Sequence, residues 1–431
     1  GSRWTFQATR MNGVIGSWIL KPDQMQVINP LLILAFIPIF ETGIYPLFAK
    51  CNLLIRPLQR MGVGGILAAV AFILSAIVEL QLEPTYAVLP GSGQAQLRIF
   101  NAYNCPMDLM LNSETSGTVN GLSKLDLLDL RVSGTALYNA NITPSQDCVD
   151  VTPPGSLFDF QVVEGQAKSV FITREGNEPV LKNISGYDTI EKSDDGYPMI
   201  RVFYNVLTGN ELKFNQDGGS KNFNYDLNPE SYQTEYISAE PASFTVMLGN
   251  NSLGQVNLQL GGVYTYILNE ETATTTAKLI TVTSPNTMHM LWLIPQYVIM
   301  TMGEVMFSIT GLEFAFTQAP VSMKSVLQSG WLLTVAFGNL VVIIIAEAKF
   351  FDSQANEFFL FAGLMLLDMA LFCWMAMKYK YVETPEEDNA GANLPLEAPK
   401  NKSRNGSTSQ PLNSEDKGRN GVENKSFNRD E

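Results

Sequence analysis

Hydrophobic residues gather in five long runs, and a block of short alternating segments stands between the second run and the third. The run at 288–312 is almost entirely apolar and is long enough to cross a bilayer as a helix. Four further runs have the same character and cover 24–49, 61–78, 326–346 and 358–377. The pattern therefore predicts a polytopic α-helical membrane protein with five complete spans, two within 23–82 and three within 286–380.

The block at 83–285 contains no stretch that is apolar for long enough to span a bilayer. Its short segments alternate between apolar and polar residues and are separated by Asn, Asp, Gly and Pro, a pattern typical of β-sandwiches. Its length suits two domains of ordinary size. Two segments open alike, GQAKSVFIT from Gly165 and GGVYTYILN from Gly261, which favours a duplication. We expect one sandwich at 83–192 and a second at 193–285.

Basic residues set the expected orientation. The loop after the first span carries Lys50, Arg56 and Arg60 without an acid, so the positive-inside rule places it in the cytoplasm. The short segment 1–22 and the β-block then face outside, while the polar tail 381–431, which cannot bury a core, is expected to be disordered and cytoplasmic. Three glycosylation sequons in the β-block agree with this orientation, at Asn141, Asn183 and Asn250.

The cysteines and the net charge narrow the classes of function. Cys105 and Cys148 are the only cysteines of the β-block and predict a disulfide worth roughly 4 kcal/mol, the alternative being two free buried thiols. Four cysteines and one histidine leave no cluster for a metal. The net charge of −14, most of which falls in the β-block, argues against nucleic acid as a partner.

Acids within the spans are the candidate functional groups. Glu304 lies deep in the third span, where a carboxylate costs roughly 3 kcal/mol to insert. Tyr297 lies seven residues earlier, two helical turns away on the same face. We interpret this pair as part of a ligand or proton pathway, the alternative being a polar side chain bonded to a neighbouring helix. Glu41, in a first span with three prolines, is a second such acid.

Several strings resemble one family: GSRWTFQAT, KPDQMQVIN, IPQY, GEVMFSITGLEFAFTQAP and MKSVLQSGWLLTVAFGN. They are similar to the proton-coupled oligopeptide transporters of the major facilitator superfamily, and most similar to the animal di- and tripeptide transporters of the intestinal and renal type. The resemblance covers the chain except the tail. It implies a C-terminal half that begins at the end of the seventh of twelve helices, with the β-block as a paired immunoglobulin-like module between helices nine and ten.

The resemblance also implies roles for single residues. Glu304 matches the acid that meets the amino terminus of the peptide, and Asn29 matches the polar residue beside it. Tyr297 and Trp331 match aromatic walls of the substrate cavity. Glu41 stands where the family carries an aspartate paired to a basic residue of helix seven, so Glu41 and Glu304 are the expected gating and proton-coupling residues.

The function implied is proton-coupled symport of di- and tripeptides across the plasma membrane by alternating access. The partners are then the peptides, protons as the coupling ion without a further cofactor, the lipid bilayer and the missing N-terminal half. The rival interpretation is a membrane-anchored adhesion or docking protein that acts through its extracellular sandwiches. It explains the β-block but not the acids within the spans. An enzyme is not expected, because no set of nucleophile and base surrounds Glu304.

Overall fold

The computed structural model describes residues 2–16, 18–112, 114–148, 151–154, 157–271, 274–318, 323–348, 351 and 353–381. The prediction for the tail 381–431 therefore falls, apart from Tyr381, outside the described residues. Among the described residues, five helical segments are long and apolar enough to cross a membrane, and each overlaps one of the predicted runs. They are Pro22–Lys50, Pro57–Thr85, Met290–Gln318, Lys324–Ile345 and Gln354–Lys378.

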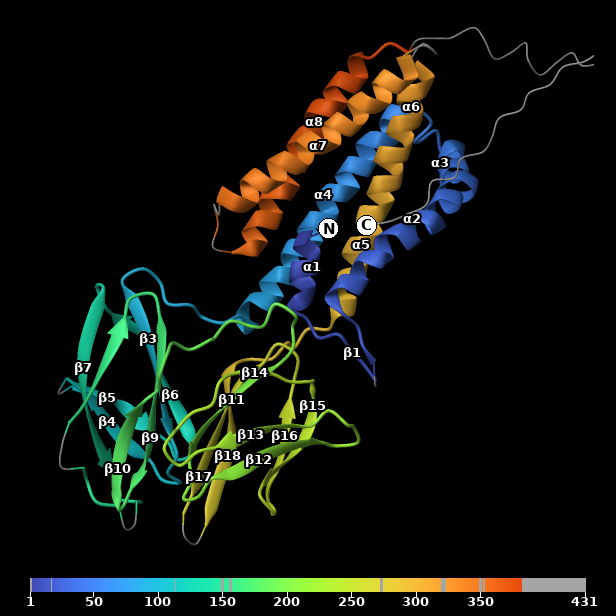
Figure 1. Ribbon diagram of the computed structural model, residues 1–431. Helices are drawn as coiled ribbons and strands as arrows, with labels where there is room; N and C mark the ends of the chain where they lie inside the picture. The colour runs from blue at the N-terminus through green and yellow to red at the C-terminus, as the bar shows by residue number, and fades with distance from the viewer. Residues whose placement is uncertain are drawn as a thin grey trace, which may run out of the picture. The chain divides into compact units, whose positions relative to one another are not determined.

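The helices appear in Figure 1 in chain order. Before the β-block lie α1 (Ser2–Thr9), the hairpin β1 (Val14–Ile15) and β2 (Trp18–Ile19), η1 (Pro22–Val27), α2 (Ile28–Ile39), η2 (Phe40–Ile44), α3 (Tyr45–Lys50), α4 (Pro57–Leu82) and η3 (Glu83–Thr85). After it lie η4 (Met290–Leu293), α5 (Ile294–Glu304), η5 (Val305–Ile309), α6 (Thr310–Gln318), α7 (Lys324–Ala348) and α8 (Gln354–Lys378).

Two of the spans are interrupted by a π-helical turn. In the first span, η2 separates α2 from α3, and Pro38 and Pro46 stand on either side of the turn. A proline supplies no backbone N–H, so the ladder cannot continue regularly there. The Thr42 hydroxyl donates to the Pro38 carbonyl at 2.7 Å and satisfies it. In the third span, η5 follows directly on Glu304. Both predicted acids, Glu41 and Glu304, therefore lie at π turns.

Small residues let α4 pack closely against α5 and α8. A Cβ placed on Gly64 would lie 2.8 Å from the Gly303 carbonyl oxygen, and one on Gly65 would meet the Met369 side chain. This confirms that the small residues of the second span serve helix packing. The buried small residues of α4 are Gly62, Gly64, Gly65, Ala68, Ala69, Ala71, Ser75 and Ala76.

The β-block consists of two pairs of four-stranded sheets. The first pair has the orders β10-β9-β3-β6 and β5-β4-β7-β8, and the second has β14-β11-β17-β18 and β13-β12-β15-β16. The strands of the first pair are β3 (Gln94–Asn101), β4 (Met107–Leu111), β5 (Glu114–Val119), β6 (Ser123–Arg131), β7 (Thr135–Pro144), β8 (Phe158–Val163), β9 (Ala167–Glu175) and β10 (Glu178–Asn183). Those of the second are β11 (Met199–Asn205), β12 (Asn210–Gln216), β13 (Phe223–Leu227), β14 (Ile237–Ser238), β15 (Ala242–Leu248), β16 (Asn251–Leu258), β17 (Val263–Glu270) and β18 (Thr275–Thr283).

The two sandwiches have the same strand order. In the first, β3 pairs in parallel with β9, and in the second, β11 pairs in parallel with β17. The two segments that open alike in sequence are β9 and β17, which occupy equivalent places in their sheets. The similarity at Gly165 and Gly261 thus corresponds to a repeat of the whole topology.

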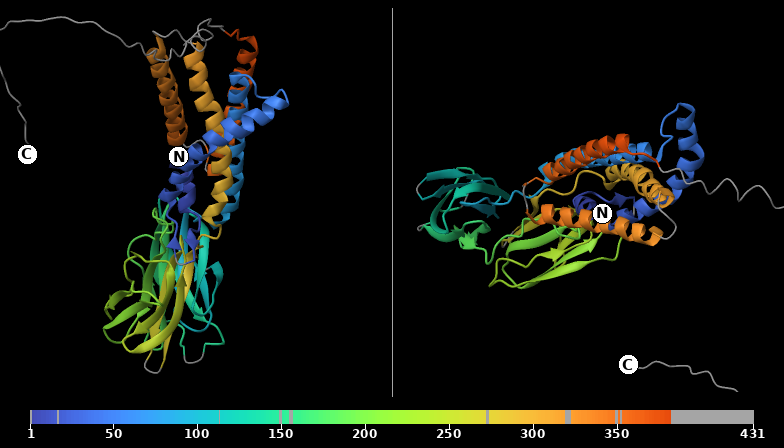
Figure 2. Two further views of the ribbon diagram at one scale, coloured as in Figure 1. Left: turned by 90° about the vertical axis from the view of Figure 1, so that its right-hand side faces the viewer. Right: turned by 90° about the horizontal axis from the view of Figure 1, so that it is seen from above.

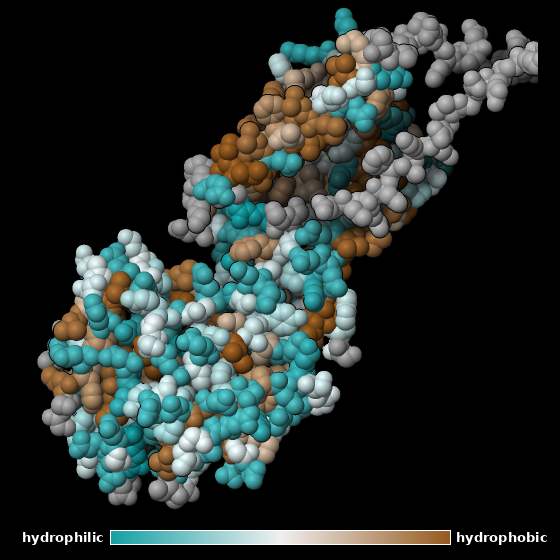
Figure 3. All heavy atoms as spheres, viewed as in Figure 1, coloured by the Kyte–Doolittle hydropathy of each residue, from teal (hydrophilic) through white to brown (hydrophobic). Residues whose placement is uncertain are grey.

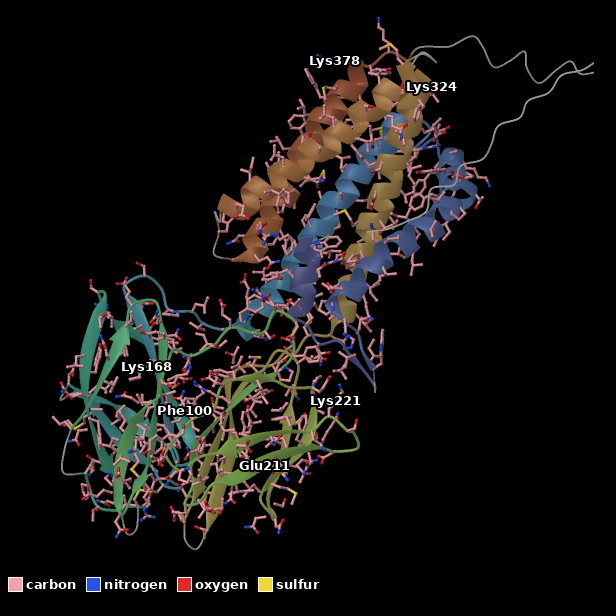
Figure 4. The ribbon with its side chains drawn as sticks, viewed as in Figure 1. Phe100, Lys168, Glu211, Lys221, Lys324 and Lys378 are labelled. Atoms are coloured by element: carbon pink, nitrogen blue, oxygen red, sulfur yellow. A yellow bond between two sulfur atoms is a disulfide. The ribbon has the colours of Figure 1, made fainter. Side chains whose placement is uncertain are left out.

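One apolar cluster joins the two sandwiches. Phe203 lies with its ring centroid 5.1 Å from that of Phe100 and 5.6 Å from that of Phe171. Figure 4 shows Phe100 between the two pairs of sheets. Because β3 packs on its own sandwich core through Leu97 and Ile99 and on this cluster through Phe100, it is buried almost along its whole length. The predicted alternation is therefore lost at this strand.

The helices and the β-block differ in the character of their surfaces. On the face shown in Figure 3, the helices are mostly covered by hydrophobic side chains and the sandwiches by a mixture dominated by polar ones. In the most apolar 18 residues of the span Lys324–Ile345, no residue is buried, whereas half of the corresponding residues of Pro57–Thr85 are buried. Figure 2 shows the helices from two further sides. The apolar surface is what a bilayer or further helices would cover.

Candidate functional site

The first candidate site is a hydrogen bond between two spans that stand on opposite sides of the β-block in sequence. The Asn29 amide nitrogen on α2 donates to Glu304 Oε2 at the end of α5, over 3.1 Å. Glu304 is half-buried, between the buried residues Gly303 and Val305. The structure thus brings together two of the residues that the sequence proposed for the substrate site.

Thr301 extends this pair and was missed by sequence reasoning. Its hydroxyl lies 2.6 Å from Asn29 Oδ1 and 2.7 Å from the Tyr297 carbonyl oxygen. A threonine hydroxyl has one proton, so it donates to one of these acceptors at a time. The Asn29 carboxamide is thereby fixed from one side by Thr301 and directs its nitrogen at Glu304. The available signal was its helical spacing, four residues after Tyr297 and three before Glu304.

Tyr297 enters this network through its backbone and not through its ring. The ring packs edge-on against Trp4 of α1, with the centroids 4.8 Å apart, in the apolar cluster between α1, α4 and α5. Its hydroxyl is buried and has no hydrogen-bond partner among the described residues. A buried donor without a partner is costly, so this hydroxyl is a group that a water molecule or ligand would satisfy.

Trp331 lies apart from the Asn29–Glu304 pair. Its ring packs over Gly311, where a Cβ would come within 2.7 Å of the indole, and lies 6.4 Å from the ring of Phe307. It lines a cavity of about 610 Å³ together with residues of α6, α7 and Tyr379. Among the contacts of the described residues, none joins Trp331 to Glu304.

Glu41 lines a different cavity, of about 550 Å³, which also contains Arg60, Tyr45 and Glu313. The Arg60 guanidinium stacks over the Tyr45 ring at 4.0 Å and donates to the Leu54 carbonyl at 2.9 Å. Glu41 itself is exposed. The part of the chain that the structure describes holds no ion pair with this carboxylate, so the expected gate partner is not among those residues.

The β-block carries the remaining predicted residues. A disulfide joins Cys105, between β3 and β4, to Cys148, which follows β7. Of the three sequon asparagines, Asn183 and Asn250 are exposed, whereas Asn141 on β7 is half-buried. Within the described ranges, no three His, Cys, Asp or Glu side chains are grouped closely enough to hold a metal ion.

A polar latch connects the β-block to the helices. Lys192, in the segment between the sandwiches, donates to Asn286 Oδ1 at 2.8 Å. The Asn286 nitrogen in turn donates to the carbonyl of Thr9, the last residue of α1, at 3.3 Å and to that of Met11, just after α1, at 3.1 Å. Burial, and secondarily the nearby charge of Arg10, lower the pKa of Lys192 to about 8.

Comparison with known proteins identifies the family. A family model described as the POT family matches residues 1–128 and 258–356, which is more than half of the chain. The chain belongs to the POT family. The family predicted from the sequence strings is thereby confirmed, and the fold is that of a POT-family transporter, with several apolar helices in a multi-pass membrane protein.

The curated relatives of this POT-family chain carry transporter names. It is 36% identical over 406 residues to "Peptide transporter family 1" of Drosophila melanogaster, covering 90% of this chain and 52% of that protein. It is 35% identical over 398 residues to "Solute carrier family 15 member 1" of Homo sapiens, covering 90% and 53%. The chain thus spans about half the length of the relatives it matches.

Solved POT-family structures are similar to a lesser degree. The crystal structure of the POT family transporter PepTSo aligns with a TM-score of 0.38 and 16% identity, covering 88% of this chain and 37% of that one. A likeness at this level carries no argument of its own. The family assignment rests on the sequence match.

Proposed function

We propose that this chain supplies the C-terminal half of the substrate cavity of a proton-coupled di- and tripeptide symporter. The observation that carries the proposal is the hydrogen bond from Asn29 to Glu304. It holds a carboxylate in a fixed direction inside a set of spans, where an acid without a function is rare. Relatives that are named as peptide transporters support peptides as the substrate class.

The chemistry of a short peptide fits these side chains. Every peptide substrate has an ammonium at one end and a carboxylate at the other, with variable side chains between them. A site for many peptides must hold the constant ends and leave the middle loose. Glu304 offers the negative charge for the ammonium, and Asn29 offers the amide that positions it. Tyr297 and Trp331 are proposed as aromatic walls, Tyr297 through its unpartnered hydroxyl.

Proton coupling is proposed for the two acids that lie at π turns. One carboxylate can hold either a proton or the ammonium of a peptide, and this exclusion is how Glu304 is proposed to link substrate binding to proton binding. Interruptions of this kind are frequent at functional sites. Glu41 is proposed to act in the gate, paired to the basic residue of helix seven that the family carries.

The decisive experiment compares two substrates in the full-length transporter. Glu304→Gln keeps the size and the hydrogen-bonding end of the side chain but removes its charge and its exchangeable proton. We expect the parent to take up a free dipeptide far better than its N-acetylated form, and the variant to lose gradient-driven uptake at normal expression. Equal uptake of both forms by the parent, or full uptake by the variant, would make Glu304 a structural acid.

The orientation in the plasma membrane is part of the proposal. Lys324 and Lys378 lie at the same end of the helices in Figure 4, which supports that end as the cytoplasmic one. The sandwiches, proposed as immunoglobulin-like, would then be extracellular, and the tail cytoplasmic. Glycosidase treatment tests this assignment. Asn183→Gln and Asn250→Gln should each remove one glycan, whereas changing Asn401, Asn405 and Asn424 together should remove none.

The rival function, adhesion or docking through the sandwiches, is not favoured. It would leave the Asn29–Glu304 bond and the membership of a transporter family without a role. The relatives described above carry no enzyme's name either. Uptake of peptide by a full-length protein that lacks the β-block would separate the two functions.

A further inference from the structure

Another acid within the spans is more deeply buried than Glu304. Glu79 lies in the last turn of α4 and is 0% exposed. The predicted span ended one residue earlier, at Val78, so the sequence did not mark Glu79 as an acid inside the bundle. Its position among α1, α4 and α5 makes it separate from the Asn29–Glu304 pair.

The hydrogen bonding of Glu79 is incomplete. Its Oε1 accepts a hydrogen bond from the Tyr86 hydroxyl, and the Gln7 side chain also favours the carboxylate. Its Oε2 is buried and has no partner with hydrogen-bond geometry among the described residues. Within the described residues, no ion pair neutralises the carboxylate. A charge without a bound counter-ion is unfavourable in such surroundings. The unpartnered oxygen is therefore the atom on which a bound proton would relieve the cost.

The surroundings of Glu79 form a polar seam between the helices. Gln7 of α1 donates to the Ser75 carbonyl at 3.1 Å, and Gln296 of α5 donates to Gln7 Oε1 at 3.1 Å. All three side chains are buried, and Gln296 Oε1 also lacks a partner in the part of the chain that the structure describes. Buried polar groups left unsatisfied are few in native proteins and call for an explanation, such as exchange of a proton or a water.

Tyr86 connects this seam to a water-accessible cavity. The cavity has a volume of about 650 Å³, and Tyr86 and Arg10 are among its lining residues. The Arg10 guanidinium stacks over the Tyr86 ring, 4.2 Å from its centroid. Burial and the charge of Glu79 raise the pKa of Tyr86, so the tyrosine stays protonated and donates its hydrogen bond to the carboxylate. The hydroxyl is thus the link between the cavity and the carboxyl.

The charged groups that face Glu79 come from three segments. Arg10 follows α1 and attracts the carboxylate, while Glu83 in η3 repels it. Glu83 is also hydrogen-bonded by Ser353, just before α8. Lys192 lines the same cavity but lies closer to Asn286. The attraction by Arg10 and the repulsion by Glu83 therefore oppose each other at Glu79. Binding of a proton is then the remaining way to remove the charge of the carboxylate.

We propose that Glu79 is a proton-binding site that exchanges with the cavity through Tyr86. In the binding step, the Tyr86 oxygen takes up a proton from the cavity as its own hydroxyl proton passes to the Glu79 carboxylate, so no tyrosinate is formed. The net change is one proton from water onto the carboxylate, without a redox step. The site is distinct from Glu304, and only its use in transport rests on the proposed function.

Infrared difference spectroscopy of the full chain in detergent tests the site without requiring transport. Spectra recorded at successive pH values should show a carbonyl band of a protonated carboxyl that disappears as the pH rises. Glu79→Gln should remove this band, while Glu83→Gln, the matched control on the next turn, should retain it. Tyr86→Phe should shift the frequency of the band, because the hydrogen bond to the carboxyl is lost.

The outcomes separate this site from the proposed function. Identical difference spectra for the parent, Glu79→Gln and Tyr86→Phe would overturn the proposal and leave Glu79 as a structural acid that fixes the end of α4. If Glu79→Gln does not fold, an unshifted band in Tyr86→Phe has the same meaning. In the full-length transporter, Glu79→Gln should also displace the pH profile of peptide uptake. If the full-length parent took up no peptide at all, that result would contradict the proposed function but not the proton site at Glu79.

Discussion

The backbones of Gly64 and Gly303 touch where α4 crosses α5. A Cβ on Gly303 would lie 2.6 Å from the Gly64 carbonyl oxygen and 3.1 Å from the Ala68 nitrogen. Such distances leave no room for a side chain at either position. Since Gly303 directly precedes Glu304, the approach of the two helices also fixes where the acid stands.

The first prediction is that Gly303→Ala destabilises the chain. The added methyl group must push α4 and α5 apart, and overpacking of this kind costs about 1–3 kcal/mol. Thermal unfolding in detergent measures the effect. Gly363→Ala, on α8, is the matched control, because nothing lies within 4 Å of its Cβ position. Equal melting temperatures for the two variants would show that the helices adjust without cost.

A second prediction concerns Thr301. Thr301→Val removes the hydroxyl that steadies the Asn29 carboxamide, and one neutral hydrogen bond is worth about 1 kcal/mol. Uptake by the full-length transporter should therefore fall about fivefold at low substrate concentration. Thr301→Ser retains the hydroxyl and should keep most of the uptake. If the serine variant is as impaired as the valine variant, the methyl group matters and the hydrogen bond does not.

Lys192 makes the stability depend on pH. Its ordinary pKa of 10.5 is lowered to about 8 in the folded chain. Below pH 8 the lysine is charged in both folded and unfolded states, and its burial costs stability. Between about pH 8 and 10.5 the folded chain has released the proton that the unfolded chain still holds, so the free energy of unfolding rises with pH. Partial exposure keeps the gain to roughly 1–3 kcal/mol.

Thermal melts at about pH 7 and about pH 10 measure this gain. The parent should be stabilised relative to Lys192→Met on going to the higher pH. Lys221→Met serves as the control, since the Lys221 side chain is 69% exposed, and it should follow the parent. If the melting temperatures of the parent and Lys192→Met change equally between the two pH values, Lys192 does not contribute to the pH dependence of stability.

The last prediction compares loss of the disulfide with changes of the two free cysteines. Cys105→Ser should destabilise the first sandwich by up to about 4 kcal/mol, because the bridge closes a loop of 43 residues. Cys51→Ser and Cys373→Ser change free cysteines and are expected to have little effect on it. Protease resistance of the β-block, with and without reductant, is the measurement. If Cys105→Ser leaves the protease resistance of the β-block unchanged, the packing of the hydrophobic core alone is enough to stabilise the first sandwich.

The sequence predicted the spans and the β-block because both depend on local patterns. Long apolar runs marked the helices. The extra residues found at their ends, as at 57–60 of α4, include polar ones and are left out by a hydropathy pattern. The opening of β9 at Gly165 and of β17 at Gly261 indicated a repeat, which the strand orders display in full.

What remained hidden depends on contacts between distant segments. Glu304 was visible as an acid in an apolar run, but its bond to Asn29 joins residues 275 positions apart. Tyr297 lies on the helix as expected, yet the ring turns to Trp4, a choice that only the packing of α1 decides. The sequence did not predict the burial of Glu79, because this burial comes from helices on two sides and not from its own sequence neighbours.

The crossing at Gly64 has a consequence for synthesis. More than 200 residues, the β-block among them, separate Gly64 from Gly303, so α4 leaves the ribosome long before α5. At translation rates of about 5–20 residues per second, α5 is synthesised about ten seconds or more after α4. During this time the glycine face of α4 is not covered by α5. A chaperone or insertase that shields this face would be needed most during that interval. Slowed translation within the β-block should therefore lower the yield of assembled protein.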